Sequence, residues 1–135
     1  MSRTNFEQLV DFGQSPWCDQ ISREMISNGE LAALRDEGIT GVTSNPSIFQ
    51  AAISSGSDYD DQILGSAQKG IAPAQIFEEI AVADIRDACE IFRPVYQSTN
   101  GIDGYVSLEV SPKLAYDTDG TMDEARRLWG LVDRP

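Results

Sequence analysis

The feature that most constrains the fold is the segment of residues 41–50, which places a strand directly before a helix. The segment of residues 39–42 is short, rich in β-branched side chains and bounded by glycine, and these features are typical of a strand. Asn45 is a good helix N-cap, and Pro46 suits the first helical position, where its missing N–H would be unpaired anyway. The segment therefore predicts a sharp strand-to-helix turn that directs Thr43 and Asn45 beyond the carboxyl end of the strand. Ligands bind there in α/β folds.

Strands and helices are expected to alternate along the chain. Strands are expected at residues 15–19, 39–43 and 104–110. Helices are expected at residues 3–12, 22–37, 46–53 and 73–95. Two more helices are expected, one from the N-cap Asp58 to about residue 70 and one that begins at the capping box of Thr121 and Glu124. This alternation predicts a parallel sheet with right-handed crossovers, in which the three strands are adjacent in chain order. Chemistry should gather at the carboxyl ends of these strands, where we find Asp19, Thr43, Asn45 and Glu109.

Three segments together resemble the transaldolases, most closely the bacterial type. The segments are Trp17 to Glu24, Gly41 to Gln50, and Gly104 to Pro112 followed by Leu114 to Thr118. They occur in the order found in that family, and the resemblance covers essentially the whole chain. It implies a parallel-stranded (β/α)8 TIM barrel, an α/β fold that typically needs ~250 residues. Residues 1–135 would then be the amino-terminal portion of a single barrel domain, with the first three strands and a boundary before the fourth.

The resemblance also implies an activity for the complete protein. Transaldolases transfer a dihydroxyacetone unit between sugar phosphates in the pentose phosphate pathway, converting sedoheptulose 7-phosphate and glyceraldehyde 3-phosphate to erythrose 4-phosphate and fructose 6-phosphate. They use a lysine Schiff base and no metal or organic cofactor. Neither Lys69 nor Lys113 matches the family's Schiff-base lysine, which belongs to the next strand, so we expect the chain alone to be inactive. The alternatives are a fructose 6-phosphate aldolase-like enzyme and a catalytically silent truncated domain that acts as an interaction module.

Four residues match functional positions of the family. Asp19 matches the group that exchanges a proton with a sugar hydroxyl while the carbon–carbon bond breaks and forms. Glu109 matches the group that shuttles protons through a water during Schiff-base formation and hydrolysis. Thr43 matches the threonine that helps to hold this water, and Asn45 matches the amide that binds substrate hydroxyls.

Each of these residues also has a purely structural interpretation. Asp19 is equally suited to cap the following helix, as Asn45 is suited to cap its own. Thr43 fits a strand because it is β-branched. Ser107 and Glu109 would share one face of their strand, and a glutamate there would be costly unless it is paired or functional, so a buried ion pair is the alternative for Glu109.

Composition excludes several classes of function and location. The net charge of −12 leaves no basic stripe for nucleic acid or for anionic membranes. The absence of histidine removes the commonest general base and the commonest metal ligand. Cys18 and Cys89 form no disulfide framework, and the amino terminus does not resemble a signal peptide, so a cytoplasmic protein is expected.

An incomplete barrel has consequences for association. A third strand without a further neighbour leaves unpaired N–H and C=O groups, so self-association through this open sheet edge is expected. Apolar positions such as Val42, Leu108 and the inner face of the last helix should be partly exposed.

Overall fold

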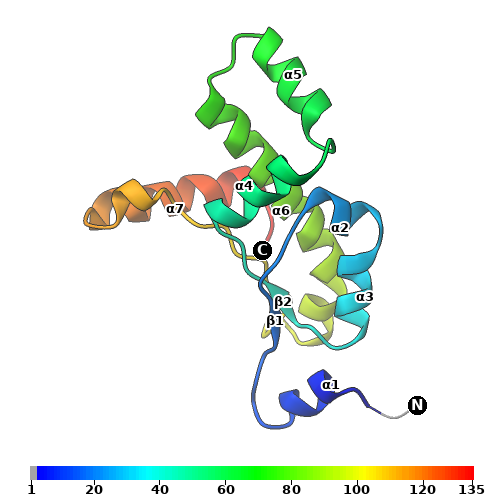
Figure 1. Cartoon of the computed structure of the whole chain (residues 1–135). Coiled ribbons are helices and arrows are strands. Elements are labelled where there is room, and N and C mark those ends of the chain that lie inside the picture. Colours follow the sequence, from blue (N-terminus) through cyan, green and yellow to red (C-terminus); the bar gives the residue numbers. More distant parts are fainter. Residues whose placement is uncertain (1–2) are drawn as a thin grey trace.

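The computed structural model describes residues 3–135 of the chain. Its elements are α1 (Asn5–Val10), β1 (Trp17–Cys18), α2 (Arg23–Ser27), α3 (Glu30–Asp36), β2 (Gly41–Val42), α4 (Pro46–Ser55), α5 (Asp60–Gln68), α6 (Pro73–Ser98), the 3-10 helix η1 (Pro112–Leu114) and α7 (Thr118–Val132). The strands lie near the middle, α5 and the beginning of α6 project together from one end, and α7 projects to one side (Figure 1). Helices therefore dominate the part of the chain that the structure describes.

The sheet has the predicted direction and order but not the predicted extent. β1 and β2 are parallel, with Trp17 opposite Gly41 and Cys18 opposite Val42. The expected strand at 104–110 is reduced to one isolated parallel bridge between Val42 and Val106. The prediction of three full strands was therefore wrong: the first two are two residues long, and the third is not formed because only Val106 of its segment pairs with β2. The structure thus contains short pieces of a parallel sheet.

Close contact between the two strands requires a glycine. A Cβ atom added to Gly41 would lie 2.4 Å from Cε2 of Trp17, a separation that no side chain tolerates. The indole of Trp17 therefore lies directly over the backbone of β2. Trp17 therefore acts here as a packing residue.

The main core lies between the sheet, α2, α3 and α6. Its buried members are Ile21, Met25, Leu31, Ile39, Val42, Phe49, Ala81, Ile85, Ala88 and Phe92. Val42 is completely buried, so the expectation that it would be partly exposed was wrong. Leu108 is only half-buried, and Trp129 of α7 is 63% exposed, so the expected exposure is found at the third segment and the last helix.

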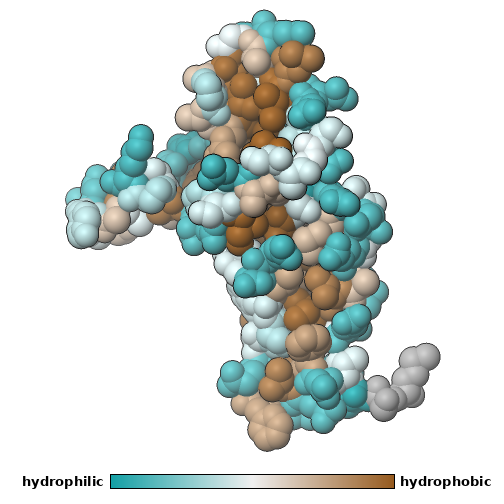
Figure 2. Space-filling model, in the orientation of Figure 1, coloured by the Kyte–Doolittle hydropathy of each residue, from teal (hydrophilic) through white to brown (hydrophobic). Residues whose placement is uncertain are grey.

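A second, smaller core joins α4, α5 and α6. Tyr59, Ile76 and Ile80 are buried in it and pack against partly buried alanine and isoleucine side chains. Figure 2 shows hydrophobic atoms between α5 and α6 at the top of the view. This projecting helix pair therefore has an apolar interface of its own.

A buried polar cluster ties this helix pair to α2. The Tyr59 hydroxyl donates a hydrogen bond to Oδ2 of Asp84 (2.8 Å) and accepts one from the backbone N–H of Arg23 (2.8 Å). The Arg23 guanidinium donates to Oδ1 of Asp84 (3.0 and 2.8 Å) and lies 4.4 Å from the centroid of the Tyr59 ring. Burial raises the pKa of Tyr59 to about 12, and it also raises the pKa of the Asp84 carboxyl. One cluster thus joins α2, the start of α5 and the middle of α6.

Several helix boundaries differ from those predicted. The expected helix at 22–37 is divided into α2 and α3 at Gly29, whose φ of 85° is left-handed. The N-cap of α5 is Tyr59 instead of Asp58. Helix α7 begins three residues before Thr121, because the Asp117 side chain accepts a hydrogen bond from the N–H of Gly120 (2.9 Å). A competing cap residue accounts for the earlier start of α7, whereas Gly29 and Tyr59 make no side-chain cap hydrogen bond.

Among residues 3–135, no helix combines the length and the apolar character that crossing a membrane requires.

Candidate active site

Thr43 lies where the two strands and the third segment meet. Its backbone N–H donates to the C=O of Cys18 (2.9 Å), which places it beside the end of β1. Its hydroxyl Oγ1 lies 3.3 Å from Oγ of Ser107, within hydrogen-bond distance. The structure therefore brings the ends of β1 and β2 together with Ser107 of the third segment around Thr43.

Ser44 is the residue that sequence reasoning missed. It is completely buried, its hydroxyl donates to the C=O of Ser107 (2.6 Å), and its N–H donates to Oγ of Ser107 (3.3 Å). The sequence held one signal for the burial of Ser44. Successive side chains of an extended segment point to opposite sides, so Ser44 faces away from the side of Thr43 and Asn45. Ser44 thus attaches the third segment to the end of β2.

Replacing Ser44 with alanine should lower the free energy of unfolding by about 1–3 kcal/mol, because the partly buried carbonyl of Ser107 loses its donor. Urea denaturation followed by circular dichroism measures this change. Ser55→Ala is the control, because the exposed Ser55 hydroxyl donates only to a carbonyl within its own helix. Equal stabilities of the two variants would show that Ser44 does not anchor the third segment.

Asn45 begins α4 as predicted. Its Oδ1 accepts a hydrogen bond from the N–H of Ile48 (2.9 Å), and Pro46 takes the first helical position. Its side-chain NH₂ group has no hydrogen-bond partner within residues 3–135. The capping role is therefore confirmed, and two donors remain for a ligand.

Asp19 follows β1 and is exposed to solvent. It does not cap the next helix, because Ser22 holds that position and accepts from the N–H of Met25 (3.1 Å). The structural alternative for Asp19 was therefore wrong. In the described residues Asp19 takes part in no ion pair, so its carboxylate is available at the end of the strand.

Glu109 is exposed as well, contrary to the expectation of a buried glutamate. It lines a shallow hollow together with residues of η1 and the beginning of α7. No ion pair to Glu109 is found among residues 3–135, so a buried ion pair does not account for it. The expected strand face that it would share with Ser107 is not formed, because the segment after Val106 is not in a strand.

The two lysines have the surroundings of surface residues. Lys69 is exposed at the C-cap of α5, and Lys113 is exposed in η1. Neither has the apolar, water-excluding surroundings that activate an amine for covalent catalysis. Within the described part of the chain, cysteine and acidic side chains form no group of three or more that would suit a metal ion.

Comparison with known proteins identifies the family. The model of the family described as Transaldolase/Fructose-6-phosphate aldolase matches residues 16–135. A transaldolase of Thiobacillus denitrificans is 49% identical over 124 residues, which are 91% of this chain and 34% of the relative. Transaldolase 2 of Nostoc punctiforme is 43% identical over 135 residues, which are 99% of this chain and 35% of the relative. The chain spans about a third of the length of these curated relatives, and it belongs to the transaldolase/fructose-6-phosphate aldolase family.

Proposed function

We propose that this chain forms the amino-terminal part of a (β/α)8-barrel transaldolase that transfers a dihydroxyacetone unit between sugar phosphates. The substrates would be sedoheptulose 7-phosphate and glyceraldehyde 3-phosphate, within the pentose phosphate pathway of the cytoplasm. The observation that carries the proposal is the meeting of β1, β2 and Ser107 of the third segment around Thr43, in a chain 49% identical to a transaldolase. Catalytic groups of barrel enzymes lie at such strand ends.

In this proposal the chain supplies the acid–base groups and the remainder of the enzyme supplies the lysine. Asp19 would exchange a proton with the sugar hydroxyl next to the bond that breaks. Glu109 would move protons through a water during formation and hydrolysis of the Schiff base, and Thr43 would hold this water. Asn45 would donate its free NH₂ group to substrate hydroxyls while its oxygen caps α4. No metal or organic cofactor is required for these steps.

Borohydride trapping tests the proposal. The test protein is a chimera in which this chain replaces the matched segment of the Thiobacillus denitrificans transaldolase. With fructose 6-phosphate, borohydride should convert the Schiff base of the chimera to a stable secondary amine, detected by mass spectrometry. The 135-residue chain alone should give no adduct. An adduct on this chain at Lys69 or Lys113 would contradict the proposal that the remainder of the enzyme supplies the Schiff-base lysine.

The second candidate function is that of a fructose 6-phosphate aldolase, because the matching family description names both activities. An aldolase releases free dihydroxyacetone from fructose 6-phosphate, whereas a transaldolase requires an acceptor such as erythrose 4-phosphate. Product analysis of the chimera with and without this acceptor separates the two. A folded chimera without either activity would favour a catalytically silent interaction module.

A further inference from the structure

Two Asn-Gly pairs occur in the chain, at residues 28–29 and 100–101. Such a pair is chemically labile, because the backbone nitrogen of the glycine can attack Cγ of the asparagine and glycine has no Cβ atom to obstruct the approach. The attack needs a glycine nitrogen that can give up its proton and a peptide plane that can rotate. The structure meets these conditions at the first pair and not at the second.

The peptide group between Asn28 and Gly29 makes no hydrogen bonds to the described residues. Both residues are exposed, in the turn between α2 and α3 (Figure 1). Neither the C=O of Asn28 nor the N–H of Gly29 has a hydrogen-bond partner within residues 3–135. A Cβ atom added to Gly29 would meet nothing within 4 Å, so the turn also has open space beside it. Rotation of this peptide group therefore breaks no bond.

Ring closure at Asn28 requires such a rotation. Asn28 has a ψ of −7°, which turns the nitrogen of Gly29 away from the asparagine side chain. Rotation of the peptide plane changes ψ of Asn28 and φ of Gly29 together. Gly29, which has a φ of 85°, can follow because glycine accepts φ of either sign. The flanking helices can keep their places during this movement.

The side-chain amide of Asn28 is held in place and polarised. Its Oδ1 accepts a hydrogen bond from the backbone N–H of Glu30 (2.8 Å). A donor at this oxygen favours attack at Cγ, because it stabilises the negative charge that the oxygen gains when a nitrogen adds to the carbonyl. The first pair thus combines an unbonded nucleophile with an activated carbonyl.

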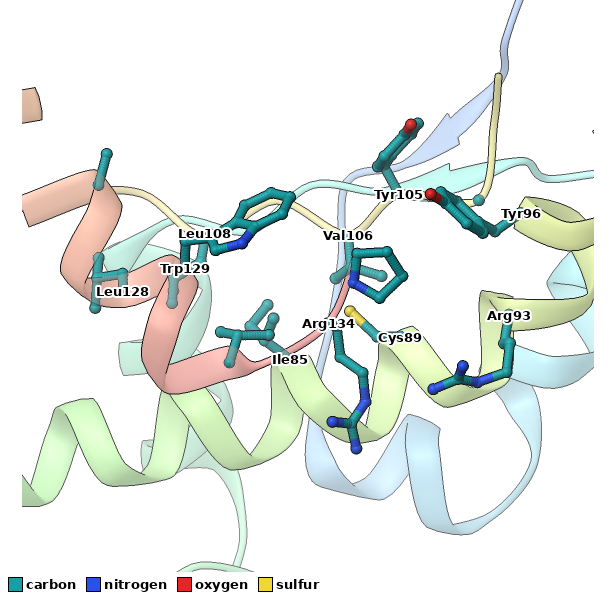
Figure 3. A pocket seen from close by; sticks show the side chains of 14 residues that line it. Ile85, Cys89, Arg93, Tyr96, Tyr105, Val106, Leu108, Leu128, Trp129 and Arg134 are labelled. Carbon is teal, nitrogen blue, oxygen red and sulfur yellow. The ribbon is translucent and has the colours of Figure 1, made fainter. Parts of the chain in front are cut away.

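The second pair is held by hydrogen bonds and by packing. The N–H of Gly101 donates to the C=O of Tyr96 (2.8 Å), and the C=O of Gly101 accepts from the hydroxyl of Tyr105. A Cβ atom added to Gly101 would lie 3.4 Å from the ring of Tyr96. Figure 3 shows the two tyrosine side chains beside each other, with ring centroids 5.6 Å apart. Attack by this nitrogen would first break its bond to Tyr96, so Asn100 is protected although it is exposed.

We propose that Asn28 is a site of spontaneous deamidation in the folded protein and that the fold protects Asn100 from the same reaction. The nitrogen of Gly29 forms a bond to Cγ of Asn28, the bond from Cγ to Nδ2 breaks, and ammonia leaves. Water then opens the cyclic imide at one of its two carbonyls, which yields aspartate or isoaspartate at residue 28. The reaction consumes one water, releases one ammonia and needs no other reactant. It involves none of the residues of the candidate active site.

Mass spectrometry of tryptic peptides tests the proposal in the folded chain. Trypsin places Asn28 in a peptide of residues 24–35 and Asn100 in a peptide of residues 87–113, whose internal Arg-Pro bond resists cleavage, and each peptide contains a single asparagine. Deamidation during incubation in mildly alkaline buffer raises a peptide's mass by the difference between water and ammonia. We expect Asn28 to react about tenfold faster than Asn100 or more, which corresponds to the one hydrogen bond that Asn100 must first lose.

Unfolding the chain in urea provides the control. The hydrogen bond that protects Asn100 is then lost, so Asn100 should react faster than in the folded chain and at a rate similar to that of Asn28. Equal rates at the two sites in the folded chain would overturn the proposal. A residue Asn28 that reacts only after unfolding would overturn it as well.

Two matched variants identify the reacting residue. Asn28→Gln lengthens the side chain by one methylene, which prevents closure of the five-membered ring, so the rapid release of ammonia should be lost. Asn100→Gln should release ammonia as the parent chain does. An isoaspartate methyltransferase should label residue 28 in the parent chain and in Asn100→Gln, because opening of the imide yields isoaspartate. Loss of the rapid phase in Asn100→Gln, or a deamidated residue 28 without isoaspartate, would refute the proposed reaction.

Discussion

In the chimera, replacing Asp19 with alanine should lower turnover by about 10²–10⁴-fold, the usual contribution of a positioned acid–base group. The fold should be retained, because the Asp19 side chain is exposed and takes part in no ion pair within the described residues. Glu109→Ala should lower turnover by more than about tenfold, because it also removes a proposed acid–base group. Fructose 6-phosphate formation in a coupled assay measures both effects.

Asp61→Ala is the matched control for these two variants. Asp61 is an exposed carboxylate in the first turn of α5, outside the meeting point of the strand ends. Its replacement should leave turnover nearly unchanged. Near-normal turnover of the Asp19 or the Glu109 variant, with the circular dichroism spectrum of the parent, would remove that residue from the proposed mechanism.

The largest expected loss of stability follows from Asp84→Ala, which should lower the free energy of unfolding by about 3–5 kcal/mol. Only 2% of the Asp84 side chain is exposed, and it accepts hydrogen bonds from Arg23 and from the Tyr59 hydroxyl. Its removal leaves a guanidinium and a hydroxyl without their acceptor in the interior. Urea denaturation of the chain measures the loss.

Two further variants make this test decisive. Asp123→Ala removes a carboxylate that is 82% exposed and pairs with Arg126 on the same helix, so its effect should stay within about 1 kcal/mol. Tyr59→Phe keeps the ring over Arg23 and removes only the hydroxyl, which should cost about 1–3 kcal/mol. If Asp84→Ala prevents folding, Tyr59→Phe still reports on the cluster. Variants of Asp84 and Asp123 with equal stability would show that the cluster contributes little.

The strand-to-helix turn could be predicted from the sequence because its determinants are local. Asn45 caps α4 through its own side chain, and Pro46 fits the first helical position, so two adjacent residues specify the geometry. The meeting of Thr43 with the third segment could also be predicted, because parallel strands joined by helices end on the same side. The role of Ser44 could not be assigned in this way, because its hydrogen bond to the C=O of Ser107 depends on the exact position of the third segment beside β2.

The third strand and the surroundings of Glu109 depend on neighbours that local patterns do not specify. Residues 106–110 alternate apolar and polar side chains, which is typical of a strand, but a regular ladder also needs bonding partners. Here Val106 has one neighbour, and the segment after it leaves the sheet and exposes Glu109. The Asp84 cluster was missed for a similar reason, because its three members come from separate helical regions of the sequence.

The bridge between Val42 and Val106 also determines when the chain can fold during its synthesis. Helices α5 and α6 follow one another closely, so their apolar interface can form soon after both have left the ribosome. β1 and β2 can pair early, but the third segment cannot join them until Val106 has been made, because parallel neighbours are distant in sequence and pair slowly. During this interval the edge of β2 that later pairs with Val106 is open to other nascent chains, which makes unwanted strand pairing a hazard of this stage of synthesis.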